Sequence, residues 1–216
     1  MDQLILRRAV DEEFAVTGAD TPPWPDPHPD GEVRDAEYSR CLDPGKYRIL
    51  AARAEAWMRA LTRLELGQAE PVADPVAIWR REPGVTVGGA VRVRPVRAGA
   101  VPLVFGFSAI DQVPKTVLVL GAGDPAVALE TAPDCGCDAC DDGSASLLEM
   151  VDDTVLAVVT GSFVHVDAGR GGEIVGVGDS WSARDWDADR PSVEEALAAA
   201  RAGRSPHAVV RGSAWG

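Results

Sequence analysis

Three of the four cysteines of this chain lie within six residues, at Cys135, Cys137 and Cys140. They belong to the segment 133–146, which reads P-D-C-G-C-D-A-C-D-D-G-S-A-S and is called the cysteine loop below. Because the spacing is so short, one tight loop can direct all three sulfur atoms at a single soft metal ion. The segment therefore predicts a loop that binds a metal, with zinc as the candidate, or that packs as a structural element.

The remaining cysteine, Cys41, lies far from this segment in the sequence. Structural zinc usually has four protein ligands, so Cys41 is a candidate fourth ligand. An isolated cysteine is more often a small buried apolar residue. Both interpretations of Cys41 stay open, and His165 or an aspartate are further candidates for the fourth position.

The charge around the cysteine loop is strongly negative. Residues 116–169 include ten acidic side chains and no Lys or Arg, and four of the acids are aspartates of the loop itself. A nucleophilic cysteine usually needs a pKa lowered by nearby cations or a helix N-terminus, and acidic neighbours act in the opposite direction. A bound divalent cation would reverse the local charge. This pattern favours metal-bound or structural thiols over a catalytic thiolate.

Length and composition limit the class of protein. A chain of 216 residues that is 46% hydrophobic can bury one good core, and we expect a single domain over residues 1–216. The first residues, M-D-Q-L-I-L-R-R, do not match a signal peptide, and no apolar run is long enough to span a membrane. We therefore expect a cytoplasmic protein, with no membrane partner and with reduced thiols. A net charge of −13 without a basic cluster also argues against a nucleic-acid partner.

The first third of the chain predicts two helices separated by a proline-rich strap. Apolar spacing indicates a helix over residues 2–17 that ends at Gly18. Residues 20–31 contain five prolines and must be extended. We expect a strap held in place by Trp24, with His28 facing solvent; the alternative is a polyproline ligand for a partner's aromatic groove. The longest helix is expected to run from Asp43 to Gly67.

The middle of the chain predicts strands. Residues 67–84 look like a connecting loop with Trp79 as a buried anchor, whereas 85–96, 101–110 and 115–120 have strand patterns. The third of these strands is followed by G-A-G-D-P-A, which imitates a dinucleotide-binding fingerprint. Too few residues separate it from Pro133 for a crossover helix, so a plain glycine turn is favoured.

The last third of the chain predicts a helix, a hairpin, a second helix and a closing strand. Ser146 and Glu149 form a capping-box pattern for a helix that ends at Gly161. Residues 162–167, which include His165, and 173–178 are expected to pair as a hairpin.

The segment 180–191 carries aspartates at alternate positions but lacks the glycine and glutamate of a calcium loop, so we expect a solvated loop anchored by Trp181 and Trp186. A helix capped by Ser192 and Glu195 and an edge strand within 207–215 complete the chain. Strands grouped between helices argue for an α+β fold, with one mostly antiparallel sheet and helices packed on one face.

Two segments together resemble a known family. Y-S-R-C-L-D-P-G-K-Y-R at 38–48 and P-D-C-G-C-D-A-C-D-D at 133–142 are similar to a family of uncharacterised actinobacterial proteins, a domain of unknown function marked by a C-G-C-D-A-C segment. The resemblance implies no established activity. Relatives often carry an aliphatic residue where this chain has Cys41, which weakens Cys41 as a required ligand. The residues of this chain that the resemblance picks out are Cys135, Cys137 and Cys140, with the adjoining Asp138 and Asp141.

Two hypotheses about function follow. In the first, the chain is a non-catalytic domain that has a cysteine-rich structural loop, with or without zinc, and that interacts with an unidentified protein partner. In the second, it is a zinc enzyme that acts through Cys135, Cys137 and Cys140, with Asp138 or Asp167 as a base. The first is favoured, because an all-thiolate ligand set from one loop is typical of structural zinc and no coherent catalytic motif is present.

Overall fold

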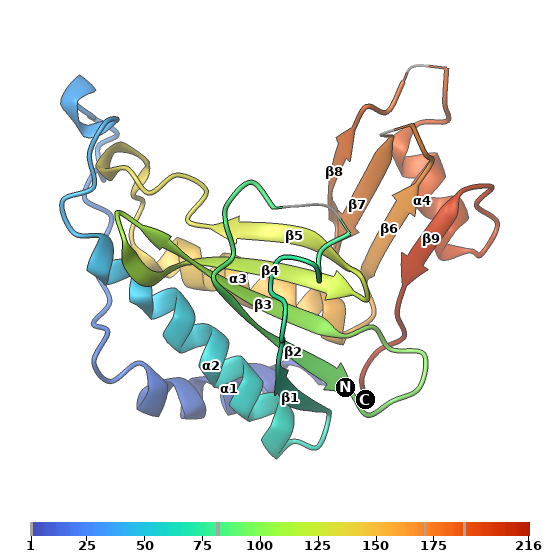
Figure 1. The fold of residues 1–216 in the computed structure, drawn as a ribbon, viewed down its shortest axis with the longest axis horizontal. Helices are drawn as coiled ribbons and strands as arrows, with labels where there is room; N and C mark the ends of the chain where they lie inside the picture. The colour runs from blue at the N-terminus through green and yellow to red at the C-terminus, as the bar shows by residue number, and fades with distance from the viewer. Residues whose placement is uncertain (1, 81–82, 171, 188) are drawn as a thin grey trace.

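The computed structural model describes residues 2–80, 83–170, 172–187 and 189–216 (Figure 1). The described residues form an α+β fold in which the strands make two antiparallel sheets, of five and four strands. The α+β class and the antiparallel pairing predicted from the sequence are confirmed. The strands divide between two sheets where one was expected. The α-helices are α1 (Gln3–Thr17), α2 (Arg48–Arg63), α3 (Ser144–Val159) and α4 (Val193–Arg201).

The first sheet is a meander in which each strand pairs with the next one along the chain. Helices α2 and α3 pack on one face of it, and α1 packs on α2 (Figure 1). Side chains such as Phe105 and Leu120 point into the core between the sheet and these helices. Its strands are β1 (Gly67–Pro71), β2 (Gly89–Pro95), β3 (Leu103–Ile110), β4 (Val113–Gly123) and β5 (Ala126–Ala132).

The opposite face of the first sheet is covered by Trp79, which is buried as expected. Its indole ring lies directly on the backbone of Gly106 and Gly121. A Cβ atom at Gly121 would lie 2.5 Å from the ring. The glycine-rich segment after residue 120 therefore ends strand β4 and makes room for Trp79, and Asp124 and Pro125 form the turn into β5.

The second sheet has the strand order β8-β7-β6-β9, and α4 packs against it. Helix α3 intervenes between β5 and β6, and β6 then pairs with β7 and β9. This is why the strands after α3 form a separate sheet. Its strands are β6 (Phe163–Asp167), β7 (Glu173–Val177), β8 (Ser180–Arg184) and β9 (Ala208–Arg211).

Several helix boundaries differ from the sequence prediction. Pro44–Tyr47 forms a 3-10 turn (η2) before α2, and Asp43 makes no side-chain capping hydrogen bond. Helix α2 ends at Arg63, because Glu65 adopts a positive φ of 57° and the chain then enters β1. The capping box expected at Ser146 is also wrong, since α3 begins two residues earlier, at Ser144.

Two segments expected to be loops contain strands. β1 begins within the supposed connection 67–84, and β8 lies within the supposed solvated loop 180–191. Trp181 on β8 is 47% exposed and does not anchor this segment. By contrast, the capping box at Ser192 and Glu195 and the edge strand β9 are confirmed. Among the described residues, none of the helices combines the length and the hydropathy that crossing a membrane requires.

Candidate metal centre

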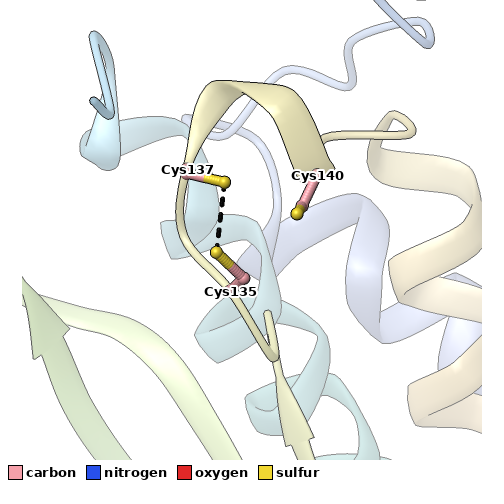
Figure 2. A group of neighbouring side chains, drawn as sticks. All are labelled: Cys135, Cys137 and Cys140. Atoms are coloured by element: carbon pink, nitrogen blue, oxygen red, sulfur yellow. Dashed lines mark hydrogen bonds between the residues drawn. The ribbon is translucent and has the colours of Figure 1, made fainter. Parts of the chain in front are cut away.

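The cysteine loop connects the end of β5 to the start of α3, at the far end of the first sheet from the second sheet (Figure 1). The ligand atoms of Cys135, Cys137 and Cys140 all lie within 4.8 Å of one another. Figure 2 shows the three side chains turned toward a common point inside the loop. The short spacing thus brings the sulfurs together, as the sequence predicted, in an arrangement that can hold a metal ion.

A short 3-10 turn (η3, Asp138–Cys140) shapes the sulfur cluster. Within it, the Cys140 amide donates a hydrogen bond of 3.2 Å to the carbonyl oxygen of Cys137. The thiol of Cys135 donates to the sulfur of Cys137 at 3.1 Å. Cys135 and Cys140 are exposed and Cys137 is partly buried, so the outer side of the cluster is open to solvent.

The turn is fixed to the segment before η2 by Asp138. Its carboxylate accepts hydrogen bonds of 3.0 Å from the Arg40 guanidinium and from the Leu42 amide. Its own amide donates to the Arg40 carbonyl oxygen at 2.8 Å. Three contacts therefore hold Asp138, the residue next to Cys137, against a segment almost a hundred positions earlier in the chain.

Asp141 fixes the other end of the turn. It is 6% exposed and accepts hydrogen bonds from the Trp24 indole at 2.9 Å and from the Gly143 amide at 3.0 Å. Lys46 forms an ion pair with it. Burial would raise the pKa of Asp141, but the hydrogen bonds from Lys46, Trp24 and Gly143 outweigh it, so the pKa lies below its ordinary value.

The proline-rich strap packs directly on the start of α3. Trp24 and Ser144 exchange backbone and side-chain hydrogen bonds of 3.1 Å. Gly143 has a φ of 88°, and a Cβ atom there would lie 2.7 Å from the Asp26 nitrogen. The strap is thus held by Trp24, as expected. His28, expected to face solvent, instead contacts Glu37 through Nε2 at 3.3 Å.

These contacts correct the electrostatic expectation from the sequence. Two of the four loop aspartates are paired with cations, Arg40 and Lys46, that come from outside residues 116–169. The acidity around the thiols is therefore lower than the local sequence indicates. Arg40, Lys46 and Trp24 were not identified as parts of the site from the sequence, although both cations lie in the 38–48 segment that carries the family resemblance.

The thiols affect one another's protonation. The hydrogen bond from the Cys135 thiol, helped by backbone amides of the turn, lowers the pKa of Cys137. The interaction with Cys137 raises the pKa of Cys140 to about 12. Metal coordination requires deprotonated thiols, so an ion bound here would compete with protons at Cys140 in particular.

Gly136 seats the loop on the first sheet. A Cβ atom at this position would lie 2.6 Å from the Ile110 side chain at the end of β3. The absence of a side chain between Cys135 and Cys137 therefore lets the backbone lie directly on Ile110.

The remaining candidate residues lie outside the three-sulfur cluster. Within the described part of the chain, the cluster that can hold a metal does not include Cys41, a partly buried residue whose pKa is raised by burial. His165 belongs to the second sheet, where its Nε2 lies 3.4 Å from Glu173. Asp167 is paired with Arg80. The thiol cluster alone is therefore the candidate metal centre, and Cys41 as a ligand stays a prediction.

Comparison with known proteins identifies a family without a known activity. A model described as "Family of unknown function (DUF6226)" matches residues 10–216. The comparisons with curated proteins and with solved structures found no match.

Proposed function

Because the chain belongs to DUF6226, a family of unknown function, we propose its function from the site: a non-catalytic domain that binds one zinc ion through Cys135, Cys137 and Cys140 and interacts with a partner protein. The observation that carries this proposal is the convergence of three thiols within 4.8 Å on a single loop. An all-sulfur donor set suits zinc, a borderline-soft ion that thiolates bind well.

The contacts that hold the cysteine loop in place support a role in interaction with a partner protein. Asp138 and Asp141 fasten the loop to the rest of the fold by hydrogen bonds that involve none of the three sulfurs. A metal is therefore not needed to attach the loop, and it would instead stiffen the exposed sulfur-bearing part of it. With Cys135 and Cys140 exposed, the fourth coordination position is accessible to a donor from a partner or to water.

The alternative function is a zinc enzyme that uses the same three thiolates. The accessible fourth position favours it, because catalytic zinc keeps one position open for water. A base is also needed. Asp138 directs its carboxylate at Arg40 and the Leu42 amide, and Asp167 belongs to the second sheet, where it pairs with Arg80, so neither proposed base is directed at the thiols. The non-catalytic function is therefore preferred.

Metal analysis of the full chain tests the proposal. The protein is purified under reducing, metal-replete conditions, its metal content is measured, and cobalt is substituted to record the absorption of sulfur-to-cobalt charge transfer. We expect one equivalent of zinc, and more than ~10-fold weaker binding in each of Cys135→Ser, Cys137→Ser and Cys140→Ser. Cys41→Ser tests whether Cys41 is the fourth ligand, since it weakens zinc binding only if Cys41 coordinates the ion.

Two outcomes would count against the proposal. Protein that holds no metal and in which all three loop thiols titrate freely would exclude zinc binding. Turnover of a substrate by the zinc form, lost in the three loop variants, would support the enzyme. We also propose that the protein is cytoplasmic, a location in which thiols stay reduced.

A further inference from the structure

Two of the three loop thiols are already in contact. The sulfur atoms of Cys135 and Cys137 lie 3.1 Å apart and face each other (Figure 2). A disulfide bond has a sulfur-to-sulfur distance of about 2.05 Å, so the two atoms need to approach by only about 1 Å. The geometry of the loop thus brings the two sulfurs into contact.

The first part of the cysteine loop is freer to move than the part from Asp138 to Asp141. The residues from Asp138 to Asp141 are held at both ends by Arg40, Trp24 and Lys46. Cys135 precedes this anchored part and is exposed. Cys135 can therefore shift toward Cys137 without breaking the hydrogen bonds and ion pairs that hold Asp138 and Asp141.

We propose that Cys135 and Cys137 form a reversible dithiol–disulfide exchange site whose oxidising substrates are low-molecular-weight disulfides. This activity goes beyond the proposed metal binding, although it uses two of the same sulfurs. Exposed disulfides exchange more readily than buried ones, and an exchange site needs one thiol that incoming reagents can reach and a second thiol beside it.

The exposure of the two cysteines assigns their order of reaction. Exposed Cys135 passes its thiol proton to the hydrogen-bonded sulfur of Cys137, and its thiolate attacks one sulfur of the external disulfide, forming a mixed disulfide and releasing the first thiolate of the reagent. The thiolate of Cys137, 3.1 Å away, then attacks the Cys135 sulfur and releases the second. The two protons lost by the protein thiols are taken up by the two released thiolates. Two protein thiols and one disulfide thus give one protein disulfide and two small thiols.

Cys140 is the third thiol and has a different role. It lies within 4.8 Å of the other two but at the end of the anchored turn, where its amide is bonded to the Cys137 carbonyl. It stays reduced when Cys135 and Cys137 are joined. If the proposed zinc site exists, oxidation removes two of its three ligands, and this one consequence rests on the proposed function.

The test uses the full chain, reduced, freed of metal with a chelator and then exposed to excess oxidised glutathione. Remaining thiols are alkylated, and the products are identified by intact mass and peptide mapping. We expect the wild type to form a Cys135–Cys137 disulfide that dithiothreitol reverses. Cys137→Ser should accumulate a glutathione adduct on Cys135, because the resolving thiol is absent. Cys135→Ser should lose the loop disulfide, with glutathione uptake at Cys137 at least ~10-fold slower than wild-type oxidation, since the accessible thiol is missing.

A matched variant at the cysteine outside the loop shows whether the exchange is specific to the loop thiols. Cys41→Ser should oxidise like the wild type, and circular dichroism should show that all variants keep the fold. A disulfide that includes Cys140, a stable glutathione adduct on Cys135 of the wild type, or equal rates in Cys135→Ser and the wild type would each overturn the proposal. Because the assay is done without metal, its failure is distinct from a failure of zinc binding, which metal analysis of the reduced protein reports.

Discussion

The indole of Trp24 donates a hydrogen bond of 2.9 Å to the carboxylate of Asp141, joining the proline-rich strap to the cysteine loop. The same indole packs edge-on against Tyr47, with ring centroids 5.6 Å apart. The strap thus helps to hold in place the loop that carries the three sulfurs. Trp24 and Asp141 are far apart in the sequence, so only the three-dimensional structure shows that one holds the other in place.

Replacing Trp24 with phenylalanine should destabilise the protein and loosen the loop. The substitution keeps an aromatic ring against Tyr47 but removes the donor to Asp141, a buried carboxylate that retains Lys46 and Gly143. A hydrogen bond to a charged group contributes ~1.5–3 kcal/mol, so we expect a loss of about that size in the free energy of unfolding. Urea denaturation measures it. Trp181→Phe, at an exposed strand position, should change stability by less than ~0.5 kcal/mol. Equal effects in the two variants would show that the Trp24–Asp141 bond has no special importance.

The close packing of Trp79 on Gly121 predicts a costly substitution. A Cβ atom at Gly121 would lie 2.5 Å from the indole, so Gly121→Ala should force the ring or the strand to move and cost ~1–3 kcal/mol. Gly88→Ala is the control, because its nearest neighbour would be an atom 3.9 Å away. Thermal unfolding followed by circular dichroism compares the two. A Gly121→Ala protein as stable as Gly88→Ala would contradict the packing found here.

Local patterns in the sequence were sufficient for the elements with one buried face or a clear cap. Helix α1 ends at Gly18 as predicted, and the box formed by Ser192 and Glu195 starts α4. The convergence of the loop cysteines was also predictable, because residues so close in sequence cannot lie far apart. In each case the information lies within a few residues of the feature it determines.

The missed strands lack that local signal. All five residues of β8 are exposed, so no alternation of buried and exposed side chains marks it as a strand. β1 starts at Gly67 and ends at Pro71, residues typical of turns that an edge strand tolerates. The partners of Asp138 and Asp141 were missed for a different reason. Arg40 and Lys46 are about a hundred residues away in sequence, and only the fold brings them to the loop.

The buried histidine of the second sheet predicts a pH dependence of stability. His165 is 1% exposed, and burial lowers its pKa despite the opposing effect of Glu173 and Asp167; Arg80 adds to the lowering. In the unfolded chain its pKa is ~6.5. Below that pH the unfolded state takes up a proton that the folded state does not, so the free energy of unfolding falls as the pH falls, by up to ~1.4 kcal/mol per pH unit.

Denaturation at pH values from ~8 to ~5 checks this sign. His165→Gln should show a smaller loss of stability on acidification than the wild type, because the titrating group is absent. His207→Gln leaves His165 in place and should keep the wild-type dependence. A His165→Gln protein that loses as much stability as the wild type would show that other groups cause the acid sensitivity.

Asp138 predicts how far the protein frame, rather than the cysteines alone, determines metal affinity. Asp138→Asn removes the ion pair with Arg40 while keeping the size of the side chain. Cys137 is its neighbour, so the 3-10 turn should become less well held, and zinc affinity should fall ~10-fold, as is usual when a residue that orients a metal ligand is changed. Competition with a chromophoric chelator measures this affinity. Faster hydrogen exchange at the Cys140 amide reports the same loosening in metal-free protein.

Asp142→Asn removes an equal charge from an exposed position of the same loop, so it separates positioning from simple electrostatics. If both variants lose affinity equally, the negative charge of the loop, and not the anchoring of the turn by Asp138, controls metal binding.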